Sequence, residues 1–261
     1  MLECVINISE GQNIALLTDL AHTVSGQLLD VHTDSEHHRS VFTMIGVEAA
    51  QTLARAAVNA LSLENHAGVH PRFGVVDVVP FVPLVGSSMA NAIEARNDFA
   101  QWAADELEVP CFLYGPEQSL PYIRKHAWRD VLPDCGPRVP HPTAGAMCVG
   151  AREPLIAYNV WLRNIDLAHT KNVAAQVRTN ELRTLGLQVG DFTQVSMNLI
   201  KPDFVGPMQA YDAVAERAKI DHAELVGLLP AAVLAEIPRD RWEQLDLSVE
   251  KTIEWRLTHR P

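Results

Sequence analysis

The sequence is poor in basic residues. It has 21 lysines and arginines against 32 aspartates and glutamates, which gives a formal net charge of −11 at pH 7. Because an acidic surface repels phosphate groups, we do not expect nucleic acid as a partner. Long apolar runs are also missing. The most apolar stretch, residues 75–86, is interrupted by Asp77, Pro80 and Pro83, and it is far shorter than the roughly 20 residues that span a bilayer. We therefore expect no membrane partner.

Cysteines are few and scattered. The four of them, Cys4, Cys111, Cys135 and Cys148, form no Cys-x-x-Cys pair. The N-terminus has no basic segment followed by an apolar one, so it does not resemble a secretory signal. In such a chain the cysteines are expected to be free thiols, and we predict a cytoplasmic protein. The histidines show no HExxH motif or other zinc-site spacing, so no metal is expected.

The remaining composition is that of a globular protein. Of 261 residues, 48% are hydrophobic and 20% are charged. This length is sufficient for one large domain or two small ones with a sizeable core. Disorder is excluded as the overall state, because it goes with low hydrophobicity and high charge density.

The spacing of apolar residues predicts the element order βαββαβ twice. In the first half we expect strands at 3–8, 27–31, 40–47 and 75–84, with helices at 13–24 and 48–63. In the second half we expect strands at 155–162, 187–190, 193–200 and 224–229, with helices at 166–185 and 207–218. Between the halves lie a predicted helix around 93–107, a strand at 111–114 and a proline-rich loop at 132–142.

The repeated order predicts an α/β (α+β) fold of two ferredoxin-like subdomains, residues 1–152 and residues 153–261. The halves share little residue identity, so this expectation depends on element order alone. Helices on one side of each sheet would leave its other face apolar. We therefore expect the two sheets to pack around a central crevice, a common location for a small-molecule site.

The segment from Gly68 to Asp77 concentrates side chains suited to acid–base chemistry directly before a predicted strand. His70 is a candidate general acid or base, because an imidazole titrates near neutral pH. Arg72 offers a planar fork that fits a carboxylate, and Asp77 is placed to orient either residue. A lone histidine more often caps a backbone group. From the residues alone, the two interpretations are about evenly matched.

Further binding residues are expected at strand ends and in the proline-rich loop. Arg39 begins a predicted strand, where it could bind an anion. Asn7 and Asn198 occupy matching strands of the two halves and could hydrogen-bond a ligand, although such residues are more often structural. The stiff loop is either a connector or a wall of the ligand site. It consists of Gly136, Pro137, Arg138, Val139, Pro140, His141, Pro142, Thr143, Ala144 and Gly145.

Several motifs in order resemble the glutamate formiminotransferase family, including the formiminotransferase part of formiminotransferase-cyclodeaminase. The opening motif is ECVINISEG at 3–11, and the central one is HPRFG at 70–74, followed by Asp77 and PFVP at 80–83. Later motifs are GAR at 150–152, IAYN at 156–159, QVSMNL at 194–199 and LVGLLP at 225–230. The resemblance therefore covers nearly the whole chain.

This resemblance implies two α/β subdomains around a folate-binding crevice, generally in a homodimer. It implies transfer of a formimino group from N-formimino-L-glutamate to the co-substrate tetrahydrofolate, giving 5-formimino-tetrahydrofolate and glutamate in histidine catabolism and one-carbon metabolism. His70 matches the catalytic histidine of the family, and the loop from Gly136 to Gly145 matches a segment lining the folate site. The other expected binding residues are Asn7, Arg39, Arg72, Gly74, Asp77 and Asn198.

The sequence departs from the animal members of the family at three places. Val69 replaces a glutamate beside the catalytic histidine, His32 replaces an acidic residue, and 141–144 replaces a segment containing serine and tryptophan. Two alternatives therefore stay open. One is a folate one-carbon hydrolase or cyclohydrolase that uses a different donor. The other is a folate-binding homologue without catalytic activity.

Overall fold

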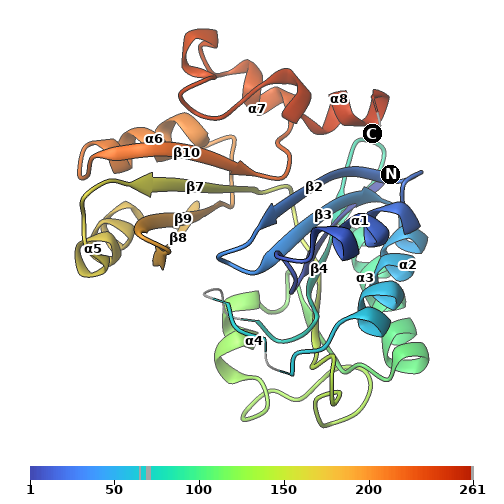
Figure 1. Cartoon of the computed structure of the whole chain (residues 1–261). Coiled ribbons are helices and arrows are strands. Elements are labelled where there is room, and N and C mark those ends of the chain that lie inside the picture. The colour runs from blue at the N-terminus through green and yellow to red at the C-terminus, as the bar shows by residue number, and fades with distance from the viewer. Residues whose placement is uncertain (65, 69–71, 260–261) are drawn as a thin grey trace. The chain divides into compact units, whose positions relative to one another are not determined.

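The computed structural model describes residues 1–64, 66–68 and 72–259. The chain divides into two compact units, one of residues 1–153 and one beginning at Pro154. Each unit contains one β-sheet with helices packed on it (Figure 1), which confirms the predicted α/β class. No helix in the described part of the chain is long and apolar enough to cross a membrane.

The first unit opens with the predicted βαββαβ order and then extends it. Its elements are β1 (Leu2–Ile8), α1 (Ile14–Thr23), β2 (Leu28–Asp34), β3 (Arg39–Ile45), α2 (Val47–Ala60), β4 (Val76–Pro83), α3 (Met89–Leu107), β5 (Cys111–Tyr114), α4 (Leu120–His126) and β6 (Met147–Ala151). The sheet order is β2-β3-β1-β4-β6-β5, with β6 parallel to both β4 and β5. The extension thus adds two strands beside β4, and α4 and β6 are elements that the sequence did not predict.

The helices of the first unit lie on both faces of its sheet. The larger core joins α1, α2 and α3 to one face through residues such as Leu20, Leu53 and Phe99. A smaller cluster, which includes Phe112, Ile123 and Cys148, packs α4 against the other face. In Figure 1, α4 accordingly lies apart from α1, α2 and α3. This second layer brings α4 to the end of the sheet where β4 begins.

The second unit repeats the βαββαβ order without an insertion. It contains β7 (Ile156–Leu162), α5 (Leu167–Val177), β8 (Leu182–Val189), β9 (Phe192–Leu199), α6 (Pro207–Ala215) and β10 (Ile220–Val226). It ends with α7 (Ala231–Ala235), two short 3₁₀ turns (Arg239–Arg241 and Val249–Lys251) and α8 (Ile253–Thr258). The order β10-β7-β9-β8 is antiparallel throughout. It matches β4-β1-β3-β2 of the first unit, the ferredoxin-like arrangement.

One predicted helix is wrong in its second half. The helix expected at 166–185 ends at Val177, and the chain re-enters the sheet as β8. Thr179 causes the change of direction, because its hydroxyl accepts hydrogen bonds from the backbone N–H groups of Glu181 and Leu182, both at 3.1 Å. Such a side-chain bond competes with helical hydrogen bonding. The last strand also begins earlier than predicted, at Ile220 instead of residue 224.

The expectation of an apolar sheet face opposite the helices is wrong for the second unit. Tyr158 and Val160 of β7 belong to the core, so Asn159 and Trp161, which alternate with them, lie on the opposite face. Both donate hydrogen bonds to one carboxylate oxygen of Glu224 on neighbouring β10, at 3.0 and 2.9 Å. This face therefore carries a satisfied polar cluster.

Replacing Gly186 by alanine should destabilise the second unit. A Cβ atom at Gly186 would lie 2.7 Å from the backbone N and Cα of Lys171 in α5, so the helix would have to move away from β8. We expect the free energy of unfolding to fall by about 1–3 kcal/mol, as for other overpacked sites, in urea titrations followed by circular dichroism. Gly26→Ala is the control, because nothing lies within 4 Å of a Cβ there. An equal effect of both substitutions would contradict this packing argument.

Candidate functional site

The carboxylate of Asp77 is the centre of a buried polar cluster in the first unit. Its Oδ2 atom accepts hydrogen bonds from Arg39 Nη2 at 2.7 Å and Arg124 Nη2 at 2.6 Å, and its Oδ1 atom accepts one from the backbone N–H of Phe73 at 2.6 Å. The Asp77 side chain is only 1% exposed. Burial alone would raise its pKa, but Arg39, Arg124 and the Phe73 N–H outweigh it and lower the pKa below the ordinary value. Asp77 is therefore ionised at neutral pH.

A β-bulge directs the Asp77 side chain. Strands β1 and β4 are antiparallel, with Asn7 opposite Val78 and Ile8 opposite Val76, so Asp77 is an extra residue without a partner in the register. Bulges commonly re-aim a side chain beside a functional site. Asn7 takes part as well, because its Oδ1 atom accepts a hydrogen bond from Arg39 Nε at 2.9 Å. The structure thus brings together three of the predicted site residues, Asn7, Arg39 and Asp77.

Arg72 is held by a second group of residues beside this cluster. Its guanidinium donates to the backbone carbonyl oxygens of His37 at 3.1 Å and His38 at 3.3 Å, in the turn between β2 and β3. The Nη1 atom also lies 2.7 and 2.6 Å from the two ring nitrogens of His66. Burial, Arg72 and His38 lower the pKa of His66. Because a guanidinium can only donate, this contact requires a neutral His66 ring.

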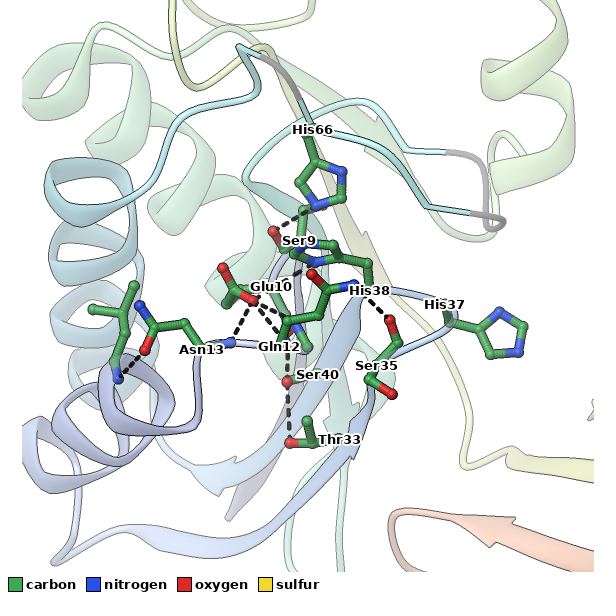
Figure 2. A network of polar contacts seen from close by, with 12 residues as sticks. Ser9, Glu10, Gln12, Asn13, Thr33, Ser35, His37, His38, Ser40 and His66 are labelled. Carbon is green, nitrogen blue, oxygen red and sulfur yellow. Dashed lines mark hydrogen bonds and ion pairs between the residues drawn. The ribbon is translucent and has the colours of Figure 1, made fainter. Parts of the chain in front are cut away.

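Two residues of the opening motif, Ser9 and Glu10, contact the rings of His66 and His38 (Figure 2). The carbonyl oxygen of Ser9 lies 2.9 Å from His66 Nε2, and the rings of His38 and His66 are 4.2 Å apart. Glu10 Oε1 lies 3.6 Å from His38 Nδ1 and accepts hydrogen bonds from three successive backbone N–H groups, those of residues 11–13. Burial would raise the pKa of Glu10, but these N–H groups and His38 lower it. Glu10 is thus a fixed anion at the start of α1.

The stiff, proline-rich loop from Gly136 to Gly145 divides into two parts. Its second part joins the cluster: Gly145 forms a bridge with Gly74, and the carbonyl oxygen of Ala144 accepts a hydrogen bond from the Val75 N–H at 2.9 Å. Gly74 must be glycine, because a Cβ there would lie 2.1 Å from the Ala146 carbonyl oxygen. In contrast, all the residues at 136–140 are exposed. The structure therefore brings Gly74, Ala144 and Gly145 close to Phe73 and Asp77, and it leaves the first part of the loop at the surface.

Two predicted residues are not joined to this cluster. Asn198 is exposed in β9 of the second unit, where it lies opposite Ala157 and Arg183 in the sheet register. It shares the polar face that carries Asn159 and Glu224, because β9 alternates buried Met197 with Asn198. His70 lies outside the described residues, and its catalytic role stays a prediction.

Sequence reasoning missed Arg124. Its guanidinium shares the Asp77 carboxylate with Arg39 and lies 5.4 Å from the centre of the Phe73 ring. The helix that carries it was recognisable in principle, because Ser119 caps its N-terminus and a proline follows in the first turn. Nothing in the sequence indicated that this helix packs beside β4. His66 was also not predicted as a site residue, although it precedes His70 by only four residues in the sequence.

Comparison with known proteins supports a single family. Residues 1–152 match the model of the formiminotransferase domain, N-terminal subdomain. A glutamate formimidoyltransferase of Streptococcus pyogenes serotype M1 is 33% identical over 291 residues, covering 97% of both chains. The chain belongs to the formiminotransferase family. The glutamate formimidoyltransferase of Thermoplasma acidophilum is 30% identical, with 92% of this chain and 91% of the relative covered.

Other members of the formiminotransferase family are longer. The formimidoyltransferase-cyclodeaminase of Rattus norvegicus is 31% identical over 283 residues, which cover 90% of this chain and 51% of that protein. The match to the family model, residues 1–152, contains every strand of the first unit and the whole Asp77 cluster. In this formiminotransferase chain, the guanidinium groups of Arg39 and Arg124 both contact the Asp77 carboxylate, and Arg72 contacts the backbone of His38, whose ring lies near Glu10.

Asp77→Asn should destabilise the protein in a pH-dependent manner. Because the pKa of Asp77 is depressed in the folded state, its contribution is complete above the ordinary value of 3.8 and disappears as the pH falls through the folded-state pKa. At pH 7 we expect the variant to lose about 3 kcal/mol of unfolding free energy, since two partly buried guanidinium groups lose their anion. Urea titrations from pH 7 down to pH 3 measure the difference.

The matched control is Asp98→Asn, on the exposed side of α3. It should leave the unfolding free energy nearly unchanged at every pH. A loss for Asp77→Asn that stays constant down to pH 3 would contradict a depressed pKa of Asp77 in the folded protein.

Proposed function

We propose that this chain transfers the formimino group from N-formimino-L-glutamate to tetrahydrofolate, giving 5-formimino-tetrahydrofolate and glutamate, with His70 as the general acid. The observation that carries the proposal is the similarity to relatives named glutamate formimidoyltransferase over nearly the full length of both chains. The chemistry of the residues also supports it, because Arg72 follows His70 by two residues and Arg39 and Arg124 meet at Asp77, at the start of β4.

The reaction needs a nucleophile, an electrophilic carbon and a proton donor. N5 of tetrahydrofolate attacks the formimino carbon, and the bond from that carbon to the glutamate nitrogen then breaks. The departing nitrogen must take up a proton, which an imidazolium at His70 would supply. Tetrahydrofolate is a co-substrate in this scheme, since it leaves carrying the transferred group.

The arginine cluster suits the donor better than the folate. The α-carboxylate of formiminoglutamate is only two bonds from the nitrogen that His70 would protonate, so a carboxylate site must lie close to His70. Arg72 follows His70 by two residues. The next residue, Phe73, donates its N–H to the Asp77 carboxylate, which also accepts hydrogen bonds from Arg39 and Arg124. The glutamate tail of folate, by contrast, is separated from N5 by the whole aminobenzoyl group. We therefore assign Arg39, Arg72 and Arg124 to the donor carboxylates.

The proposed site for the donor carboxylates is also shaped by Asn7, Gly74 and Asp77. For the folate we propose the loop Gly136–Gly145 together with Asn198. The exposed part of the loop, residues 136–140, offers accessible backbone groups. Asn198 lies on a sheet face that already carries polar side chains, Asn159 and Glu224 among them. These assignments rest on the family resemblance of the loop and on the exposure of both segments.

His70→Ala should lower kcat for formimino transfer by about 10²–10⁴-fold, the usual contribution of a general acid, while tetrahydrofolate still binds. Formation of 5-formimino-tetrahydrofolate from formiminoglutamate is followed by absorbance, and folate binding is followed by calorimetry. His22→Ala, on the exposed side of α1, is the control and should keep full activity. Folate binding by the wild type without turnover would favour the non-catalytic alternative. Turnover of another formimino- or formyl-folate alone would favour the hydrolase or cyclohydrolase.

Arg124→Gln should raise the KM for formiminoglutamate by about 10–100-fold, because a charge-assisted hydrogen bond is lost, and should leave the KM for tetrahydrofolate unchanged. Steady-state kinetics with each substrate varied in turn measure both constants. Arg129→Gln, an exposed arginine that follows α4, is the control. A rise in the KM for tetrahydrofolate alone would assign Arg124 to the folate tail instead.

A further inference from the structure

Two of the four cysteines lie directly opposite each other. Cys111 in β5 forms an antiparallel bridge with Cys135. The backbone N–H of Cys111 donates to the Cys135 carbonyl oxygen at 3.0 Å, and the Cys135 N–H donates to the Cys111 carbonyl oxygen at 3.3 Å. Residues paired in this manner have Cα atoms about 5.5 Å apart, which is within the range that a disulfide spans.

The two thiols also share one face of the sheet. Cys111 belongs to the core beneath α3, and Cys135 packs against that same core. Cys148 on the neighbouring strand β6 belongs instead to the cluster on the opposite face, with Phe112 and Ile123. Cys148 is therefore separated from the pair by the sheet, although β6 is adjacent to β5.

The partners differ in access to solvent. Cys111 is fully buried, whereas Cys135 is half-buried and precedes the exposed part of the proline-rich loop. Cys135 is outside any strand, so a small approach toward Cys111 does not have to break a strand ladder. Both are reduced in this structure. A reagent in solution would thus meet Cys135 first and find Cys111 directly behind it.

We propose that Cys111 and Cys135 form a reversible intramolecular disulfide when the protein meets a low-molecular-weight disulfide such as oxidised glutathione. The Cys135 thiolate attacks one glutathione sulfur, forms a mixed disulfide and releases one glutathione thiolate. The Cys111 thiolate then attacks the Cys135 sulfur and releases the second glutathione. The two cysteines lose two electrons, oxidised glutathione gains them, and the two thiol protons pass to the released glutathione molecules.

The environment of the thiols sets the rate of this exchange. Burial raises the pKa of both Cys111 and Cys135, and nearby Asp134 raises both further. Because the thiolate is the attacking species, oxidation should be slow at neutral pH and should accelerate as the pH rises. At neutral pH the Cys111–Cys135 disulfide should therefore form only during prolonged exposure to an oxidant.

The cross-link would close a segment that matters for the Asp77 cluster. The chain between Cys111 and Cys135 contains α4 and so carries Arg124, which bonds to Asp77. Closing this loop reduces the conformational freedom of the unfolded segment. Oxidation should thus make α4 harder to detach from the sheet, without changing the contacts that α4 already makes.

The test uses the reduced full-length protein, incubated at several pH values in mixtures of oxidised and reduced glutathione and then alkylated. Intact-mass measurement should show that two hydrogens are lost and that two of the four thiols remain unoxidised. Peptide mapping should show the Cys111 and Cys135 peptides joined. The oxidised protein should melt at a temperature higher by about 5 °C or more, given typical loop-closure effects, and a reducing agent should reverse the shift.

Matched variants separate the pair from the other thiols. Cys148→Ala should still form the cross-link, whereas Cys135→Ser should lose it and leave Cys111 unmodified. A glutathione adduct that persists on Cys135, a disulfide that includes Cys148 or a second chain, or the absence of oxidation in pure oxidised glutathione would each overturn the proposal. A cross-link without a change in the melting temperature would overturn its stabilising effect on the α4 segment.

Discussion

The buried carboxylate of Asp77 is the interaction on which the described part of the site depends. An ionised carboxylate without partners would be very costly in the interior, but this one accepts three hydrogen bonds, from Arg39, Arg124 and the backbone of Phe73. These partners come from β3, α4 and the segment that precedes β4. One side chain therefore connects three regions that are far apart in the sequence. These three regions stay together because the loss of any one donor would leave the buried Asp77 charge poorly compensated.

Backbone geometry on both sides of Asp77 keeps that carboxylate in place. The bulge opposite Asn7 and Ile8 removes Asp77 from the regular strand register, and the close approach of Gly74 to the Ala146 carbonyl leaves no space for a side chain. Ser9 adds a hydrogen bond from its hydroxyl to the Gly74 carbonyl oxygen at 2.8 Å. The segment at 72–77 is thus fixed along its whole length. The glycine of the HPRFG motif, Gly74, therefore has a structural reason.

The sequence predicted most of this fold and part of this site, and the failures have identifiable causes. Asn7, Arg39 and Asp77 were found because each lies in or beside a strand whose apolar pattern is strong. Arg124 was missed because no local pattern tells which sheet face a short helix such as α4 will cover. The helix at 166–185 was too long because Leu182 continues the apolar spacing of α5, whereas the hydrogen bonds of Thr179 decide the turn. The polar face with Asn159 and Glu224 depends on cross-strand pairing that spacing alone does not give.

The cationic cluster lies in an acidic protein, and the two facts are compatible because they act over different distances. Charges at the surface are screened over about 8 Å at physiological ionic strength, so the net charge of −11 acts mainly on how fast an anionic substrate approaches. Arg39 and Arg124 act at hydrogen-bond distance in a poorly hydrated environment, where charge pairs are much stronger than in water. Burial lowers the pKa of Arg39, yet a guanidinium remains protonated at physiological pH. The affinity for a carboxylate is therefore set by these few contacts and not by the overall charge.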